Sequence, residues 1–305
     1  MNIQYVKHED IDFQRWDRCI RKAVNGSIYG YSWYLNTVSK EWNALIDENY
    51  ENVMPLTYRT ILGIKMLIQP HLATNLGVYS SQVLDGEKVN SFIAAIPKEY
   101  RYVRINLNKY NKLSVDNIKV SGDIHYELDL IEPYNKIRSR YTKEAINAIK
   151  VAEDKNITII SGLNSADLIH IYQKNKGFLW NIFFRQRIAT LKVLVSTAVR
   201  FRVGHIYGAY QNNNRLCAAA FFVTVHKRAT LLFLGLDKEA IKNHVLEAII
   251  DEFIKLHCEQ DLTLRFEFAS RKKYAGIYAG IGGRRYRFMS IQQNRLPWYL
   301  KFLKL

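Results

Sequence analysis

The chain has 305 residues, 48% of them apolar and 13% aromatic, which suits two packed domains and excludes a largely disordered protein. Its net charge of +16 excludes an acidic protein, and its polar, acidic start (residues 1–12) argues against a secretory signal. The longest apolar stretch, 216–225, is too short to span a bilayer, so we expect no transmembrane segment.

The number and spacing of the cysteines indicate a reducing compartment. Cys19, Cys217 and Cys258 are odd in number, widely separated and without a CxxC pair. This pattern argues against a disulfide framework or a zinc site, and we expect no metal. Small buried thiols are typical of a reducing compartment, so we expect a cytoplasmic protein.

The first half of the chain predicts alternating helices and strands. In order, these are helices 11–24 and 32–38, strands 53–56 and 64–68, helix 88–96 and strand 101–107. Ser32 is the expected cap of the second helix. In the last strand, Tyr102 should lie on one face and Val103 and Ile105 on the other.

A domain boundary is expected where polar residues interrupt the pattern between 110 and 124. It gives an N-terminal domain of residues 1–122 and a C-terminal domain of residues 123–305. The second domain should open with strand 125–130, a helix after Pro133, strand 157–160 and helices 165–176 and 187–201.

The remaining elements carry the topological information. They are strands 203–210, 215–224 and 229–234, helix 238–257, strand 262–268, helix 272–280 and strand 284–291. The Asn run at 212–214 predicts a hairpin, because Asn tolerates left-handed backbone. Three antiparallel strands then lead through a helix to a parallel strand, which predicts an α/β fold with a mixed sheet. Strands 229–234 and 262–268 should splay apart.

The positive charge is unevenly distributed. Residues 1–129 contain 15 Lys and Arg against 15 Asp and Glu, whereas residues 130–305 contain 29 against 13 and carry the whole +16. Such asymmetry favours an anionic partner for the second half: phosphates, an acidic polymer such as tRNA, or lipid head groups through peripheral membrane association. Many basic proteins bind nothing acidic specifically, and that alternative stays open.

The order of these elements and several local segments resemble the GNAT superfamily. Segments 243–254 (NHVLEAIIDEFI), 264–267 (LRFE) and 276–282 (GIYAGIG) are similar to the Fem-type aminoacyltransferases and to Bacteroidetes GNAT-like proteins, with Tyr278 and Gly282 matching the group's pattern. Further similar segments are 33–35, 42–45, 50–55, 75–78, 126–130 and 294–298. The resemblance covers nearly the whole chain and implies two tandem GNAT-like acyltransferase domains, with aminoacyl-tRNA as a possible donor.

Two departures bear on the chemistry. Where the group tends to have Asp-Phe at a strand end, this chain has Arg265-Phe266, which leaves Glu267 as the carboxylate there. Acetyl-CoA users place a glycine-rich loop before the helix after the third strand, to bind pyrophosphate. Here that position is 235–239 (GLDKE), where Asp237 should cap the helix and, with Glu239, repel a diphosphate. Acetyl-CoA or acyl-CoA is therefore disfavoured as a cofactor.

Glu267 is the candidate catalytic residue, as a general base that takes a proton from an attacking amine. Arg265 lies on the same face, so an ion pair between the two is the structural alternative. The candidate substrate- or phosphate-binding residues are Arg265, Arg271, Lys272, Lys273, Tyr278 and Arg285. Arg285 fits the solvated face of an edge strand equally well.

The sequence supports two functions. One is an acyl- or aminoacyltransferase that acts on an amine or hydroxyl of a cell-envelope or polysaccharide precursor. Such a domain relies on positioning and on backbone N–H groups at the splayed strands, so it needs no conspicuous catalytic motif. The other is a catalytically inert GNAT-like module that binds tRNA or another anionic polymer. The chain contains no GxSxG, GxxxxGK[ST] or HExxH motif.

Overall fold

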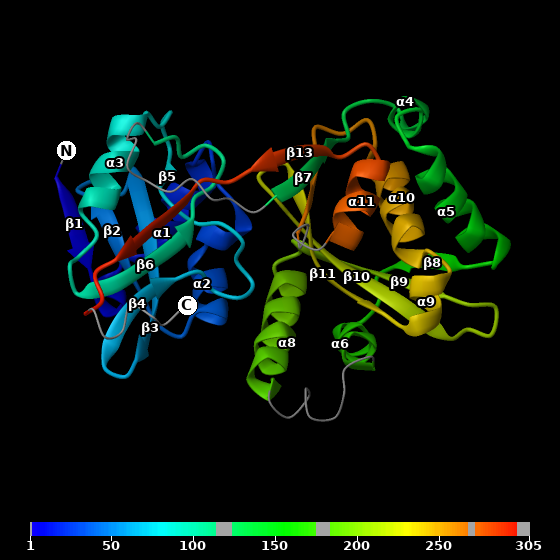
Figure 1. The fold of residues 1–305 in the computed structure, drawn as a ribbon, viewed down its shortest axis with the longest axis horizontal. Coiled ribbons are helices and arrows are strands. Elements are labelled where there is room, and N and C mark those ends of the chain that lie inside the picture. The colour runs from blue at the N-terminus through cyan, green and yellow to red at the C-terminus, as the bar shows by residue number, and fades with distance from the viewer. Residues whose placement is uncertain (1, 114–123, 175–183, 268–271, 298–305) are drawn as a thin grey trace. The chain divides into compact units, whose positions relative to one another are not determined.

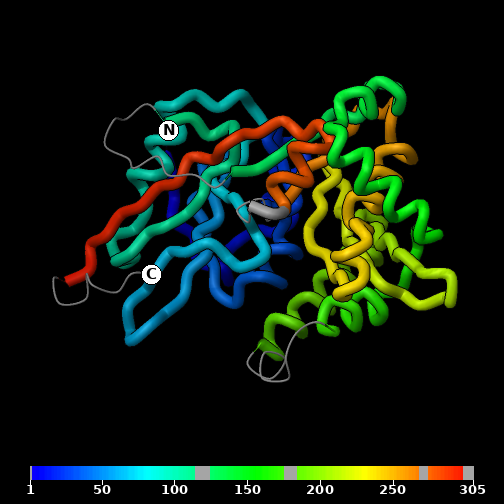
Figure 2. The backbone as a smooth tube through the Cα atoms, turned by 45° about the vertical axis from the view of Figure 1, so that its right-hand side comes forward, coloured from blue at the N-terminus to red at the C-terminus, as the bar shows by residue number. Residues whose placement is uncertain are grey.

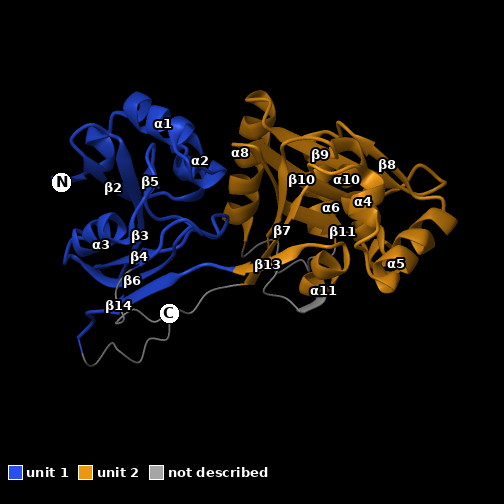
Figure 3. Cartoon of the chain, turned by 90° about the horizontal axis from the view of Figure 1, so that it is seen from above, with its two compact units in different colours: residues 1–123, 287–305 blue, residues 124–286 orange. Residues whose placement is uncertain are grey.

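The computed structural model describes residues 2–113, 124–174, 184–267 and 272–297. The chain forms two compact units, residues 1–123 with 287–305 and residues 124–286 (Figure 3). The second unit begins at Ile124. The second unit ends at Tyr286, not at residue 305 as expected.

The first unit is built on a mixed sheet. Its elements are β1 (Ile3–Val6), α1 (Phe13–Lys22), α2 (Ser32–Val38), β2 (Trp42–Asp47), β3 (Asn52–Ile61), β4 (Ile64–Ile68), β5 (Tyr79–Ser80), α3 (Gly86–Ala94), β6 (Tyr100–Asn106) and β14 (Ser290–Asn294). The strand order is β1-β2-β3-β4-β6-β14, with β5 beside β3 and with β4 and β6 parallel. Val103 and Ile105 enter the core while Tyr102 lies on the other face, as the alternation predicted.

The start of α2 differs from the prediction. Ser32 is the first helical residue, and the cap position is Tyr31, which makes no side-chain cap. The Ser32 hydroxyl instead donates to Asp17 at 2.7 Å. The Asp17 carboxylate also accepts the Ser32 backbone N–H at 2.8 Å, so a residue of α1 provides the hydrogen-bond partner for one N–H in the first turn of α2.

The C-terminal strand belongs to the first unit. The expected strand 284–291 is two strands, β13 (Arg284–Arg287) and β14, and β14 pairs antiparallel with β6 (Figure 2). Ile291 lies opposite Ile105 and is 1% exposed in the core of this unit. Residues 287–305 bring four Lys and Arg and no acid, so the first unit carries +6 and the second +10. The prediction that the second domain holds all the charge is therefore wrong.

The second unit is built on another mixed sheet, in the order β13-β7-β12-β11-β10-β9-β8. Its strands besides β13 are β7 (Ile124–Asp129), β8 (Thr158–Ser161), β9 (Gly204–Tyr210), β10 (Leu216–Val225), β11 (Arg228–Leu236) and β12 (Thr263–Phe266). Its helices are α4 (Tyr134–Arg138), α5 (Lys143–Asp154), α6 (Ser165–Lys174), α8 (Arg185–Arg200), α9 (Lys238–Lys242), α10 (Val245–His257) and α11 (Lys272–Gly280). The expected hairpin joins β9 and β10, with Asn214 at a φ of 55°.

Helices cover both faces of this sheet (Figure 1). On one face, α5, α10 and α11 enclose the core around Phe253 and Phe266. On the other face lie α6 and α8, and α6 approaches so closely that a Cβ at Gly235 of β11 would lie 2.5 Å from the backbone nitrogen of Tyr172. Only glycine permits that distance.

Candidate functional site

The described pairing between β11 and β12 ends before β11 does, at the place where the element order predicted a splay. These parallel strands pair from Arg228 opposite Thr263 to Leu231 opposite Phe266, while β11 continues to Leu236. A bulge lies at the same place, since the pairing with β10 shifts around Leu232. Bulges bend a strand and increase its twist, so we expect the end of β11 to turn away from β12.

The backbone of β11 directs a donor into this opening. The Asp237 N–H donates to the Cys217 carbonyl at 2.9 Å, which fixes the hydrogen-bonded positions of the antiparallel pair. Bonded and non-bonded positions alternate, so the Leu234 N–H points away from β10, toward the side where the described pairing with β12 has ended. A backbone N–H at that place is suited to a developing oxyanion.

A pocket of about 270 Å³ lies at the end of β11. Its walls are mainly apolar, and its polar members are His244 and Glu247; the other lining residues are Leu236, Ala240, Ile241, Leu246, Tyr274 and Ile277. His244 Nδ1 lies 3.0 Å from Glu247 Oε1, and Glu247 is 7% exposed. The pocket is therefore apolar with one buried carboxylate, and an anionic ligand would be disfavoured beside it.

The pocket exists because the expected helix 238–257 is two helices. His244 has a φ of 54°, which ends α9 and starts α10 in a new direction. Its side chain makes no cap bond to the N–H groups of α10. Neither Gly nor Pro marks this break in the sequence, so helical periodicity alone predicted a continuous helix.

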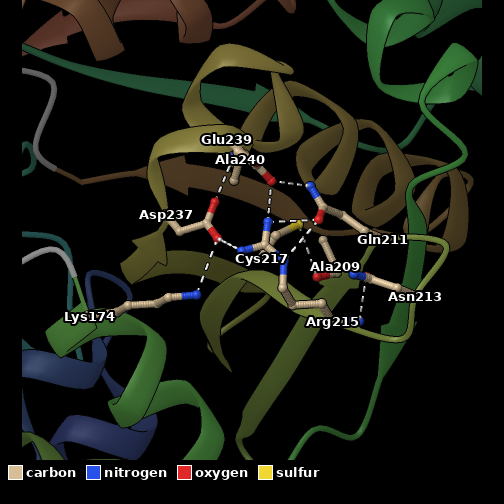
Figure 4. Close-up of polar contacts among 9 residues, drawn as sticks. All are labelled: Lys174, Ala209, Gln211, Asn213, Arg215, Cys217, Asp237, Glu239 and Ala240. Atoms are coloured by element: carbon tan, nitrogen blue, oxygen red, sulfur yellow. Dashed lines mark hydrogen bonds and ion pairs between the residues drawn. The ribbon is translucent and has the colours of Figure 1, made fainter.

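Asp237 caps α9 as predicted. Its side chain accepts the Ala240 N–H at 2.8 Å, and its other oxygen lies 3.4 Å from Lys174 Nζ and 3.2 Å from an Arg215 nitrogen (Figure 4). Arg215 also pairs with Glu239 and donates to Gln211. The cap position at 235–239 is therefore occupied by the chain's own carboxylate. Its charge is matched by two cations, so the expected electrostatic repulsion is weaker than the sequence suggested.

The other side of the splay carries a buried polar cluster. Glu267 follows the last residue of β12 and is 1% exposed, and its Oε2 lies 3.8 Å from Nδ1 of the buried His125 on β7. Arg265 is also buried and donates to the Tyr286 hydroxyl at 2.9 Å. Burial raises the pKa of Tyr286 above its usual range, and the Arg265 charge opposes that rise. Alternation along β12 places this cluster on the face opposite Phe266.

The remaining predicted residues lie apart from this cluster. Tyr278 is fully buried, and its ring stacks on Phe266 with centroids 4.4 Å apart. Its hydroxyl has no hydrogen-bond partner among the described residues, and burial raises its pKa. Arg285 is exposed on β13. Arg271 lies outside the described residues, as do the side chains of Lys272 and Lys273 at the start of α11.

Sequence reasoning missed His125 and Glu247. His125 precedes an apolar strand residue, and only the pairing of β7 with β12 brings it to Glu267. Within the described ranges, no group of three or more His, Cys, Asp and Glu could hold a metal ion. None of the helices described there is long and apolar enough to cross a membrane.

No protein-family model and no curated sequence matches the chain. Solved structures do. FemX is similar over 96% of this chain and 97% of its own, at 9% identity and a TM-score of 0.62. A conserved protein of unknown function from Bacteroides thetaiotaomicron is similar over 93% of this chain and 97% of its own, at 10% identity and a TM-score of 0.57. L-PGS from Bacillus licheniformis is similar over 93% of this chain and 92% of its own, at 9% identity and a TM-score of 0.56. These likenesses confirm the α/β fold class, which the chain shares with FemX and L-PGS, and the two mixed sheets are consistent with a tandem arrangement.

Proposed function

We propose that the chain is an acyl- or aminoacyltransferase that acts on an amine or hydroxyl of a cell-envelope or polysaccharide precursor. The splay between β11 and β12 carries this proposal, because it has an apolar pocket on one face and a buried carboxylate–imidazole pair on the other. A donor and an acceptor that enter from opposite faces would meet at the strand ends.

The transfer follows from these positions. The acceptor nitrogen or oxygen attacks the acyl carbon, and the carbonyl oxygen gains negative charge beside the Leu234 N–H. The proton of the acceptor passes to Glu267, whose Oε2 lies 3.8 Å from His125 Nδ1. The bond from the acyl carbon to the leaving group then breaks, and the leaving group takes up the proton held by Glu267, which restores the carboxylate.

The donor side favours an aminoacyl ester over acyl-CoA. The cap position of α9 is filled by Asp237, and the pocket beside α10 contains the Glu247 carboxylate. At the cap, Asp237 already accepts the Ala240 N–H that a diphosphate could use, and in the pocket a diphosphate would meet the Glu247 carboxylate, whereas the ammonium of an aminoacyl group would be stabilised there. Aminoacyl-tRNA is therefore the proposed donor class.

A transfer assay tests the proposal. The full chain is incubated with a mixture of radiolabelled aminoacyl-tRNAs or with acyl-CoA, together with envelope precursors bearing free amines or hydroxyls. We expect consumption of charged tRNA that depends on acceptor, and a fall of about 100-fold or more in Glu267→Gln. Glu153→Gln, an exposed carboxamide substitution on α5, is the matched control. Turnover of acyl-CoA but not of aminoacyl-tRNA would refute aminoacyl-tRNA as the donor class. Full activity of Glu267→Gln would refute Glu267 as the general base.

An inert module that binds an anionic polymer is the second candidate. It is favoured by β13, where Arg284, Arg285 and Arg287 are exposed within four residues. Steeply salt-dependent binding of tRNA without turnover of any charged tRNA would support this module. Binding accompanied by turnover would support the transferase.

A further inference from the structure

One continuous part of the second unit contains no acidic residue. Residues 168–236 hold ten Lys and Arg and no Asp or Glu. At the composition of the whole chain, 28 acids in 305 residues, a stretch of this length would contain about six acids. The depletion indicates a surface from which negative charge is excluded.

Some of these cations are used within the fold. Lys174 and Arg215 pair with Asp237, and Lys227 pairs with Asp261. The cations that remain are concentrated on α8 and just after it. Arg185, Arg187, Lys192, Arg200 and Arg202 are exposed, and none of the five forms an ion pair with any described residue.

The two faces of α8 have different compositions. One face packs into the unit through Ile188, Leu191, Leu194, Val195 and Ala198. On the opposite face Arg185, Lys192 and Arg200 recur about two helical turns apart, with Ala189 and Ser196 between them. The cations therefore form one outward row along a helix about 24 Å long.

Apolar side chains accompany this row. Val193 is 54% exposed, Val199 43%, and Phe201, directly after the helix and between Arg200 and Arg202, 52%. Cations interspersed with exposed apolar groups are typical of helices that lie in a membrane interface, where head groups neutralise the cations and acyl chains cover the apolar groups. A nucleic-acid backbone would satisfy the cations and leave Val193 and Val199 in water.

We propose that the outward face of α8, from Arg185 to Arg202, docks on an anionic lipid bilayer. The occupant is the bilayer surface itself, recognised by its negative charge and its shallow apolar layer. Docking would hold the second unit at the membrane without a spanning segment. The proposal concerns location and is independent of the transfer chemistry.

Vesicle flotation with the full chain tests it. The probes are phosphatidylcholine vesicles with and without about 30% phosphatidylglycerol. We expect binding only to the anionic vesicles, weakened by about 0.5 M salt. Arg185→Gln/Lys192→Gln/Arg200→Gln should bind at least about tenfold more weakly. Lys143→Gln/Lys150→Gln/Lys155→Gln removes the same charge from exposed positions on and after α5 and should bind within about twofold of the parent.

The apolar groups are tested separately with Val193→Ser/Phe201→Ser, which keeps every charge. This variant should bind anionic vesicles more weakly while its salt dependence is unchanged. Equal losses in the α8 and α5 charge variants would mean that net charge alone drives binding, and would overturn the proposal. Salt-dependent binding of tRNA through the same three cations, with no vesicle binding, would assign this face to RNA and would also overturn it.

Discussion

His125 Nδ1 lies 3.8 Å from Glu267 Oε2, and both side chains are buried where β7 and β12 run side by side. If the two act as one unit in proton transfer, removing either should cost nearly as much activity as removing both. We therefore expect His125→Gln, Glu267→Gln and the double variant to lose similar factors in kcat, with about 100-fold as the scale. Independent, multiplying losses in this cycle would contradict a joint role, and matching circular dichroism spectra would exclude unfolding as the cause.

Gly235 is required by the close approach of α6 to β11. A methyl group there would meet backbone atoms of Tyr172 and Ile171 at 2.5 and 2.8 Å. Backbone atoms cannot relieve the clash by a rotamer change, as a side chain can. Gly235→Ala should therefore lower the free energy of unfolding by about 1–3 kcal/mol. Gly276→Ala on α11 has open space around the new methyl group and should be stabilising by up to about 1 kcal/mol. Urea unfolding of both variants gives the comparison, and equal effects would refute the packing explanation.

His226 makes stability depend on pH. Burial, with a smaller effect of Arg228, lowers the pKa of His226 to about 4 in the folded chain, below its ordinary value of 6.5. The unfolded chain therefore binds the proton more readily. The contribution of His226 to the free energy of unfolding is therefore fully present above about pH 6.5, and it decreases as the pH falls from there toward 4. His226→Asn tolerates the φ of 52° and should reduce the fall in Tm between pH 7.5 and 5.5.

The exposed His170→Asn is the control for this effect. Burial also lowers the pKa of His205, so some acid sensitivity should remain in His226→Asn. An unchanged slope of Tm against pH in His226→Asn would rule out His226 as a source of it.

Ile291 anchors the C-terminal strand in the first unit. Because it is 1% exposed opposite Ile105, Ile291→Ala should cost about 2–5 kcal/mol of unfolding free energy. Its neighbour Gln292 is exposed, and Gln292→Ala should change stability by less than about 0.5 kcal/mol. Hydrogen exchange should locate the loss from Ile291→Ala in β6 and β14. A loss spread evenly over both units would argue against separate cores.

Local sequence patterns predicted much of the fold because they report on local structure. The alternation through Leu264, Arg265, Phe266 and Glu267 correctly placed the apolar pair in the core and the charged pair on the other face. The capping preference of aspartate identified Asp237, and the asparagine run identified the β9–β10 turn.

The missed features depend on parts of the chain that are far apart in sequence. His125 and Glu267 are brought together by strand pairing, and no periodicity near either residue indicates the other. The pairing of β14 with β6 also joins segments that are far apart in sequence, and the residues around 288 contain no linker signal. The break at His244 is local, but no Gly or Pro marks its left-handed backbone, and the helical spacing of the apolar residues continues across it.

The position of β14 has a consequence for synthesis on the ribosome. The first unit cannot complete its sheet until residues 290–294 have left the exit tunnel, after every residue of the second unit. Until then β6 is an open edge strand, which is a template for pairing with another chain. The second unit, whose described strands are contiguous in the chain, can fold first. Nascent chains that stall before residue 290 should therefore be the aggregation-prone species of this protein.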